Sequence, residues 1–342
     1  MCQRVWTRIP KPVTNELRDD VVGEETDKAE YRERHERYIN KGHLGSKESV
    51  NQEPRSSIEH HGGKEEREED VPDVYAHIRI EYQTPMPPLS SDEKLLLRDK
   101  YDGSASAAFE EDRARLATGE PLAYVIGWVP FMGLSIDLSS RPLIPRPETE
   151  WWTGELVRTL RARFKDEPFS LLDLCAGSGA IGLAVLAMCE NAQVSFGEVV
   201  PEHTALIKKN MERNEIDVSR AGIRAGDLFE PFVGRRFDVI VANPPYIPSG
   251  RTLDASVTDF EPKEALFAGT DGLELIRRIA TDAPQHLRGE GVAEGTGELW
   301  LECDIENIEE ARELLLSGGA VDVVVREDLY KRPRILVSYY SS

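Results

Sequence analysis

The sequence is poor in cysteine, in aromatic residues and in long apolar runs. Only four of its 342 residues are cysteines, and no two of them have Cys-x-x-Cys spacing. This disfavours a disulfide-stapled secreted domain, and because none of the seven histidines stands at metal-ligand spacing from a cysteine, no metal site is expected. No run approaches the ~18 apolar residues of a membrane span, and no apolar signal segment opens the chain, so neither membrane insertion nor secretion is expected.

The sequence also lacks a surplus of positive charge. It has 42 Lys and Arg and 62 Asp and Glu, which gives a formal net charge of −20. The acidic excess continues beyond residue 90, throughout the part of the chain that is richest in apolar residues. Nucleic-acid binding draws most of its affinity from phosphate neutralisation, so direct contact with DNA or RNA is not expected.

Changes in composition divide the chain into four segments. Residues 1–89 are polar and predicted to be flexible, whereas 90–118 have the spacing of two short helices. Residues 119–150 are expected to form a connector, in which 124–138 make paired strands with turn glycines. Residues 151–342 are expected to form the main domain.

In the main domain, helical and strand patterns alternate, which predicts an α/β fold with a doubly wound, largely parallel sheet. Ligands of such sheets bind beyond the carboxyl ends of the strands. The expected helices are 151–165, 180–190, 201–214, 272–288 and 305–317, and the expected strands are 169–174, 193–197, 222–225, 237–242, 298–302, 320–326 and 334–340.

A glycine-rich turn follows the first of these strands. Gly177, Gly179 and Gly182 spell G-x-G-x-x-G, which is found in dinucleotide-binding turns but also suits any tight turn between a strand and a helix. Glu198 ends the next strand, where a carboxylate can bind both ribose hydroxyls of a nucleoside. Asp173 precedes the glycines, which suits a ligand with an amino-acid tail, such as S-adenosylmethionine, better than a pyrophosphate.

Two further features stand at the same predicted edge of the sheet. Asp227 follows the third strand and can accept a hydrogen bond from an adenine amino group, with Leu228 packing on the ring. Asn243-Pro244-Pro245-Tyr246 follows the fourth strand. Two successive prolines stiffen a loop and leave carbonyls free, so the Asn243 side-chain oxygen and the Pro244 carbonyl can both accept from one planar NH₂ group, with Tyr246 packing on it.

These motifs closely resemble the HemK/PrmC protein glutamine N5-methyltransferases over residues 119–342. Asn-Pro-Pro-Tyr alone is shared with DNA enzymes that methylate amino groups, but the RPETE segment at 146–150 and the hairpin before it are specific to this family. The matching stretches are GEPLAY at 119–124, FMG at 131–133, LIPRPETE at 143–150, DLCAGSGAI at 173–181, GDLF at 226–229, NPPYIP at 243–248, FEP at 260–262, DGL at 271–273, DL at 328–329 and RPR at 332–334.

The resemblance implies a Rossmann-like class I S-adenosylmethionine-dependent methyltransferase with a small N-terminal helical region and a β-hairpin connector. It implies transfer of a methyl group to the glutamine amide nitrogen in the Gly-Gly-Gln motif of a class I peptide release factor, by a monomer. The implied cofactor-binding residues are Asp173, Cys175, Ala176, Gly177, Ser178, Gly179, Glu198, Asp227, Leu228 and Asn243; Asn243, Pro244, Pro245 and Tyr246 hold the glutamine amide, and Phe131 helps to close over it.

Three other functions remain open. An enzyme that methylates adenine N6 in DNA or RNA would use the same acceptors, but needs the basic face that is missing here. A non-catalytic partner of release factors would have no reason to keep Asn243, Pro244 and Tyr246. The third is a dehydrogenase with bound NAD, but the second crevice motif has no residue near it that is a candidate for hydride acceptance.

Some residues have two interpretations. Pro145 to Glu150 either lie beside the active site, as in the family, or form a rigid connector in which Arg and Glu pair. Glu261 and Asp271 are expected to be solvated surface carboxylates. Cys175 stands where the family often has glycine, a change that the turn is expected to tolerate, and a catalytic thiol is not expected.

The N-terminal segment bears on substrate docking and on localisation. Family members usually carry an N-terminal bundle of several helices, of which only 90–118 matches the last part. Arg4, Arg8 and Lys11 precede any acidic residue, as in an organelle transit peptide, although a plain polar tail fits equally well. We expect a mitochondrial location if the source is eukaryotic and a cytoplasmic one if it is bacterial.

Overall fold

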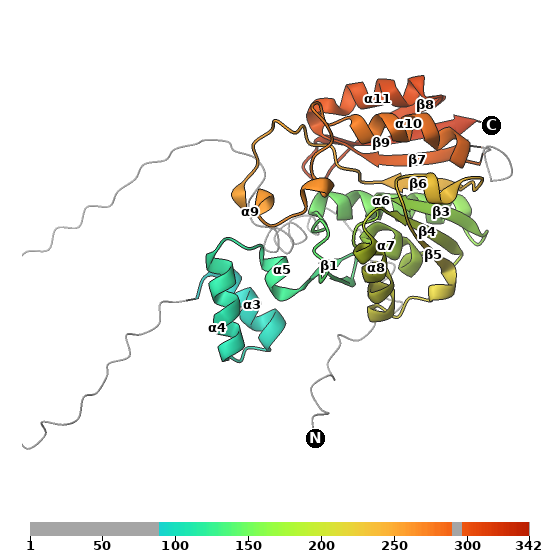
Figure 1. Ribbon diagram of the computed structural model, residues 1–342. Helices are drawn as coiled ribbons and strands as arrows, with labels where there is room; N and C mark the ends of the chain where they lie inside the picture. Colours follow the sequence, from blue (N-terminus) through green and yellow to red (C-terminus); the bar gives the residue numbers. More distant parts are fainter. Residues whose placement is uncertain (1–88, 289–295, 342) are drawn as a thin grey trace, which may run out of the picture.

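The computed structural model describes residues 89–288 and 296–341 (Figure 1). The predicted flexibility of 1–88 and the transit-peptide interpretation lie outside these residues. The helices are α3 (Ser91–Tyr101), α4 (Ala107–Ala117), α5 (Leu122–Ile126), α6 (Pro147–Phe164), α7 (Ala180–Met188), α8 (Pro201–Arg213), α9 (Ala255–Thr258), α10 (Glu274–His286) and α11 (Ile308–Ser317), with short 3₁₀ turns at 218–220, 230–232, 263–265 and 305–307. The strands are β1 (Trp128–Phe131), β2 (Leu134–Asp137), β3 (Phe169–Leu174), β4 (Ala192–Glu198), β5 (Ala221–Ala225), β6 (Val239–Ala242), β7 (Thr296–Glu302), β8 (Asp322–Glu327) and β9 (Pro333–Ser341).

The large sheet has seven strands in the order β5-β4-β3-β6-β7-β9-β8. Neighbours from β5 to β7 are parallel, while β9 runs antiparallel to both β7 and β8. The predicted largely parallel, doubly wound sheet is therefore confirmed. The expected strands and helices of the main domain are all present, with ends that differ by up to four residues.

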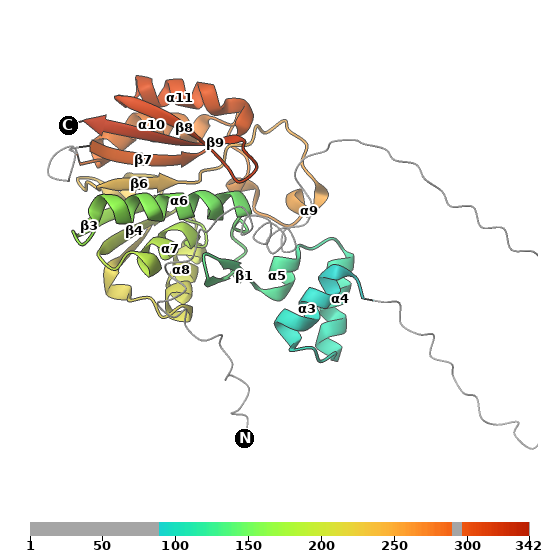
Figure 2. The same ribbon diagram turned by 180° about the vertical axis from the view of Figure 1, so that it is seen from behind.

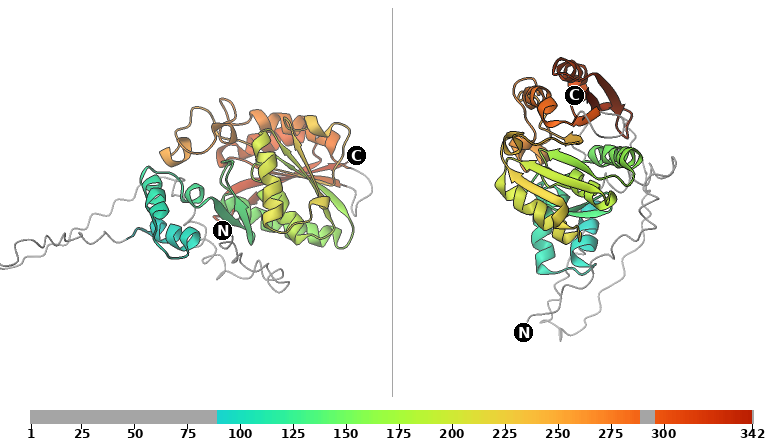
Figure 3. Two further views of the ribbon diagram at one scale, coloured as in Figure 1. Left: turned by 60° about the horizontal axis from the view of Figure 1, so that its bottom comes forward. Right: turned by 90° about the vertical axis from the view of Figure 1, so that its right-hand side faces the viewer.

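Side chains alternate between the two faces of this sheet, as strand geometry requires. Leu171, Val241 and Trp300 pack in the core under α6, α7 and α8, whereas Leu172 and Ile240 pack in the second core under α10 and α11. Figures 2 and 3 show the resulting three layers, with the sheet between two groups of helices. Both faces are buried, which explains why β6 is apolar at every position and β3 at four of its six.

The connector differs from the prediction at both ends. Residues 124–126 belong to the helix α5, which ends at Gly127 with a φ of +95°, so only 128–137 form the predicted hairpin. At the other end, Pro147 opens α6, so that 147–150 form the first turn of a helix. Proline favours this position because it has no N–H to leave unpaired there and its φ already fits a helix.

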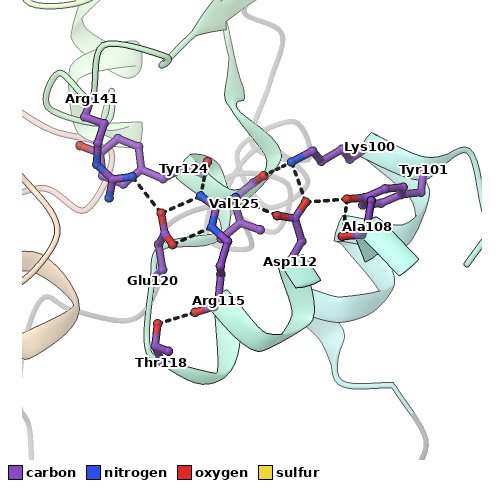
Figure 4. A network of polar contacts seen from close by, with 10 residues as sticks. All are labelled: Lys100, Tyr101, Ala108, Asp112, Arg115, Thr118, Glu120, Tyr124, Val125 and Arg141. Carbon is purple, nitrogen blue, oxygen red and sulfur yellow. Dashed lines mark hydrogen bonds and ion pairs between the residues drawn. The ribbon is translucent and has the colours of Figure 1, made fainter. Parts of the chain in front are cut away.

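Ion pairs connect α3 and α4, which lie away from the large sheet, to the segment after the hairpin (Figures 1 and 4). Asp112 accepts from Lys100 and Arg115 at 2.6 and 2.7 Å. Arg115 also donates to Glu120, which in turn accepts from Arg141 at 2.9 Å. Hydrogen bonds from Arg115 lower the pKa of Glu120 below its ordinary value. Arg115 thus bridges two buried carboxylates between the helices and the connector.

Candidate active site

Polar residues at the carboxyl ends of β3, β4 and β6 meet at one edge of the sheet. Asp173 pairs in register with Phe196 of β4 and Val241 of β6, so Glu198 and Asn243 lie just beyond it on the neighbouring strands. This is the carboxyl edge, where ligands of doubly wound sheets bind. The structure therefore brings together the acidic residues and the Asn-Pro-Pro-Tyr segment, which are 70 residues apart in the sequence.

Glu198 is fixed by two backbone N–H groups. Its carboxylate accepts from Gly177 at 2.7 Å and from Val200 at 2.9 Å, one bond on each oxygen. Each carboxylate oxygen has a second lone pair, so Glu198 can still accept from the two hydroxyls of a ribose. This geometry is compatible with the predicted binding of a ribose by Glu198.

The turn between β3 and α7 runs through left-handed backbone conformations. Cys175, Gly177 and Gly179 have φ values of +57°, +55° and +81°. A Cβ on Gly177 would meet no atom within 4 Å, so this glycine borders open space at the edge of the sheet. Ala176 donates to the carbonyl of Gly197, and the Ser178 carbonyl accepts from Asn210, which anchors the turn to β4 and α8.

The strained φ of Cys175 predicts that glycine is well tolerated there. A left-handed residue with a side chain costs about 1–2 kcal/mol, and Cys175→Gly removes this cost while it loses half-buried side-chain contacts. We expect the free energy of unfolding to change by less than about 1 kcal/mol. The matched control Cys189→Gly, at a buried residue with a φ of −123°, is expected to lose about 2 kcal/mol. Urea denaturation of both variants measures this, and equal losses would contradict the prediction.

Asp173 is 1% exposed and has one oxygen without a partner. Its Oδ2 accepts from the N–H of Gly182 at 2.8 Å, while Oδ1 is buried and unbonded. Burial raises the pKa of Asp173 to about 8, and the nearby Glu198 carboxylate adds to the rise. A buried acceptor with no donor is the feature expected of a site that receives one from a ligand.

Asp227 and Leu228 follow β5 and have different surroundings. Asp227 is about half exposed and pairs with Arg278 of α10 at 2.7 Å. Leu228, with a φ of +45°, is buried against the core under α10. The pairing of Asp227 with Arg278 has no counterpart in the sequence-based interpretation, and the contacts of both residues with an adenine ring stay predictions.

Asn243 and Tyr246 both connect to one buried carboxylate. Asn243 donates through Nδ2 to Thr149 Oγ1 at 3.2 Å, and Thr149 donates to Glu302 Oε2 at 2.7 Å. The Tyr246 hydroxyl donates to Glu302 Oε1 at 3.0 Å, and Arg334 lies 3.5 Å from the same hydroxyl. Burial raises the pKa of Tyr246 well above its ordinary value, so the phenol keeps its proton for this bond. Glu302 itself is 1% exposed.

The expectation that Glu261 is a solvated surface carboxylate is wrong. Glu261 is 5% exposed, pairs with Arg146 at 2.5 Å and accepts from the backbone N–H of Ile144 at 3.2 Å. The connector folds its apolar residues inward at this point, and the Arg146 guanidinium compensates the buried charge. Asp271 is about half exposed as expected, although it is paired with Arg277, whose hydrogen bond lowers the pKa of Asp271 to about 2.

The two interpretations of Pro145 to Glu150 both apply, to different residues. Arg146 pairs with Glu261, and Glu148 pairs with Arg332 at 2.8 Å, so these side chains stabilise the structure. Glu150 accepts from the N–H of Met132 at 2.6 Å and so joins α6 to the hairpin turn. Thr149 contacts Asn243.

Phe131 has no open face in this structure. It is 1% exposed and packs in the core shared by α5, the hairpin and α6. Its predicted role in closing over the glutamine stays a prediction. The backbone beside Phe131 is fixed, because the N–H of Met132 donates to Glu150.

Comparison with known proteins adds to this geometry. Residues 153–263 match a family model described as "Methyltransferase small domain". The chain is 33% identical over 250 residues to the release factor glutamine methyltransferase of Mycolicibacterium smegmatis, which covers 72% of this chain and 84% of that protein. It is 37% identical over 238 residues to the enzyme of that name from Pseudomonas aeruginosa, covering 69% and 82%. The chain belongs to the release factor glutamine methyltransferase family.

Solved structures with a similar fold include a methyltransferase from Pyrococcus furiosus, with a TM-score of 0.43 and 17% identity over 68% of this chain and 99% of that one. The hMettl16 catalytic domain with a MAT2A 3′UTR hairpin has a TM-score of 0.49 and 20% identity, over 78% and 94% of the two chains. The curated relatives and the family model confirm the predicted family resemblance and the class I methyltransferase fold.

The cofactor of this methyltransferase is S-adenosylmethionine, as predicted. The residues present fit it: Asp173 Oδ1 is a buried acceptor that lacks a donor, and Gly177 leaves open space beside the turn. Asp173 would hold the amino group and Glu198 the ribose. In residues 89–288 and 296–341, no cluster of His, Cys, Asp and Glu suits a metal ion. No helix in the same ranges is both long and apolar enough to cross a membrane.

The pKa of Asp173 predicts that cofactor binding releases a proton. Below about pH 8 the free methyltransferase keeps Asp173 protonated, whereas a cationic amino group favours the carboxylate. Affinity should therefore rise with pH, by up to about tenfold per unit from pH 6 to 7.5, above which the amino group of the cofactor itself begins to titrate.

Calorimetry in two buffers of different ionisation enthalpy measures this release. Asp173→Asn is expected to abolish the pH dependence. Asp166→Asn, at an exposed residue before β3, is expected to keep it. Affinity that stays flat between pH 6 and 7.5 in the unmodified methyltransferase would contradict the assignment of Asp173.

Sequence reasoning did not find Glu302, Arg334 or the role of Thr149. Glu302 ends an apolar strand and so carries the same signal as Glu198, a carboxylate at the carboxyl edge of the sheet. Arg334 lies at the start of β9, which runs antiparallel to β7. Its start therefore meets the carboxyl end of β7, and this placement cannot be predicted without knowing the strand order. Thr149 stands between two glutamates, and nothing in its local pattern marks it.

Proposed function

We propose that this methyltransferase transfers the methyl group of S-adenosylmethionine to the side-chain amide nitrogen of the glutamine in the Gly-Gly-Gln motif of a class I peptide release factor. One observation carries the proposal. Among the described residues, no donor bonds to Asn243 Oδ1 or to the Pro244 carbonyl, although both lie at the carboxyl edge of the sheet. Two adjacent free acceptors suit a planar NH₂ group, and the names of the relatives supply the glutamine.

The residues present assist the reaction mainly by orientation. When bound, S-adenosylmethionine supplies an electrophilic methyl group on a sulfonium sulfur. Asn243 Oδ1 and the Pro244 carbonyl accept hydrogen bonds from the two N–H groups of the amide. These bonds orient its nitrogen toward that methyl group. As the N–C bond forms and the C–S bond breaks, positive charge develops on the nitrogen, and both acceptors stabilise it. The nitrogen then loses one proton to water, so no strong base is needed.

Tyr246 and the prolines shape the surroundings of this nitrogen. Pro244 is buried, which fixes its carbonyl, and Tyr246 is half-buried with its hydroxyl bound to Glu302. The Tyr246 ring can therefore pack on the amide plane without turning. Fixed acceptors need no reorganisation during the reaction, and positioning of this kind lowers a barrier by several kcal/mol.

A labelling experiment tests the proposal. The purified protein is incubated with S-adenosylmethionine carrying a tritiated methyl group and a class I release factor. A Gly-Gly-Ala variant of the factor and duplex DNA serve as parallel substrates. We expect label on the unmodified factor alone. Label on DNA would instead support an adenine methyltransferase, and cofactor binding without any transfer would support a non-catalytic partner.

The remaining assignments concern partner, assembly and location. The release factor is the expected partner, the enzyme is expected to act as a monomer, and nucleic acid is not expected to bind, in keeping with the net charge of −20. The location is mitochondrial if the source is eukaryotic and cytoplasmic if it is bacterial. The basic residues at 4, 8 and 11 support the first. Imaging of the tagged full chain and light scattering of the purified protein test these points.

A further inference from the structure

Thr149 lies between the reacting edge of the sheet and a buried carboxylate. It stands in the first turn of α6, is 4% exposed, and its hydroxyl contacts two groups. Oγ1 lies 2.7 Å from Glu302 Oε2 and 3.2 Å from Asn243 Nδ2. Glu302 reaches this position because its neighbour Leu301 pairs in register with Ala242, the residue before Asn243. The sheet itself therefore places Glu302 next to Asn243.

The chemistry of these groups fixes the direction of each hydrogen bond. Glu302 Oε2 also accepts from the indole N–H of Trp152 at 2.7 Å, and an indole can only donate. Oε2 is thus an acceptor, so the single proton of Thr149 goes to it. The hydroxyl then offers only lone pairs to Asn243. Of the two ends of the Asn243 carboxamide, only the NH₂ end can donate a hydrogen bond to such a lone pair.

We infer that Thr149, held by Glu302, is a positioning residue that sets the orientation of the Asn243 carboxamide. With NH₂ toward Thr149, Oδ1 faces the substrate amide and accepts from it. With the carboxamide turned by 180°, two acceptors would meet at Thr149, and an NH₂ group would face the NH₂ of the substrate. The inference rests on the proposed function for its substrate, but the orientation itself is a property of the free enzyme.

Glu302 extends the same control to Tyr246. Its Oε1 accepts from the Tyr246 hydroxyl, so one carboxylate fixes both the carboxamide and the ring. The acceptor and the packing surface for the glutamine thus share one anchor on β7. This gives the threonine of the RPETE segment a role in positioning that differs from the ion pairs of its neighbours Arg146 and Glu148.

Kinetics of two substitutions at Thr149 test the inference. Thr149→Val keeps the shape but removes the hydroxyl, and kcat with a release factor is expected to fall 10- to 100-fold while the KM for S-adenosylmethionine stays within threefold. Thr149→Ser restores the hydroxyl, and kcat is expected to return to within threefold of the unmodified enzyme. Thr153→Val is the matched control, because Thr153 is equally buried one turn later and donates only to the Thr149 carbonyl. It is expected to keep kcat within threefold.

A measurement without substrate separates this inference from the proposed function. The Asn243 side-chain amide signals are assigned in a nitrogen-proton correlation spectrum by their loss in Asn243→Ala. Their exchange with water is expected to speed up at least tenfold in Thr149→Val and to stay slow in Thr149→Ser and Thr153→Val. Unchanged exchange in Thr149→Val, or a Thr149→Ser variant as impaired as Thr149→Val, would overturn the inference. Slow exchange in an enzyme that labels no release factor would overturn the proposed function alone.

Discussion

Asn243→Ala is expected to lower kcat with a release factor by 10²- to 10³-fold, which corresponds to about 3–4 kcal/mol in the activation free energy. The substitution removes one of the two acceptors that face the substrate amide. Thr149 also loses the donor to its hydroxyl, but the Asn243 side chain that is removed is only half-buried. The loss should therefore appear in the chemical step. The affinity for S-adenosylmethionine should change by less than about tenfold, because Asp173 and Glu198 are untouched.

Single-turnover methylation and calorimetric titration with the cofactor measure these two quantities separately. The matched control is Asn191→Ala, because Asn191 lies at the opposite end of the sheet, before β4, and donates to the backbone of the loop after α6. It is expected to keep kcat within threefold. An Asn243→Ala enzyme with nearly full kcat would remove the basis of the proposed mechanism, whatever its substrate.

Gly272→Ala is expected to have the largest effect on stability. Gly272 has a φ of +81°, and a Cβ there would lie 2.3 Å from the backbone oxygen of Tyr246 and 3.0 Å from Pro248 Cδ. Real Cβ atoms do not approach so closely, and the obstacle is backbone rather than a flexible side chain. The left-handed conformation costs about 1–2 kcal/mol and the overlap about 1–3 kcal/mol more, so a total loss of about 2–5 kcal/mol is expected.

The same substitution is expected to lower kcat about 100-fold, because it displaces the backbone of Tyr246 from its place beside the substrate. Gly234→Ala separates the two causes. Gly234 has a φ of +75°, but a Cβ there would meet nothing within 4 Å. It should lose only the 1–2 kcal/mol of the backbone conformation and keep full activity. Thermal unfolding and kcat of both variants decide the matter; equal losses would show that close packing on Tyr246 is unimportant.

The main features of the fold could be predicted because they depend on local patterns. Apolar runs such as 169–174 and 237–242 predicted central strands, and the glycines at 177 and 179 predicted the turn between β3 and α7. The segment 124–126 was expected as a strand because its apolar run continues into β1. It is helical because Gly127, with a φ of +95°, ends one turn of helix there. A run of three to five apolar residues does not distinguish the two structures.

The candidate site could be predicted only where each residue stands at the carboxyl end of a strand or directly after it. Asp173, Glu198 and Asn243 meet this condition. The partners of Arg146 and Glu148 do not, since Glu261 and Arg332 lie 115 and 184 residues further along the chain. The pairing of distant charges depends on how loops cross the edge of the sheet, and no short sequence pattern specifies that path.

The strand order at one edge of the sheet has a consequence for biosynthesis. The strand β8 precedes β9 in the chain, yet β9 lies between β7 and β8 in the sheet. When β8 is synthesised, the strand that it will pair with has not yet been made. The sequence from 322 to 327 must therefore wait, unpaired, until 333–341 have emerged and paired with β7. Arg334, which approaches Tyr246, arrives in the same step, so the catalytic edge is completed only when synthesis of this last strand is over.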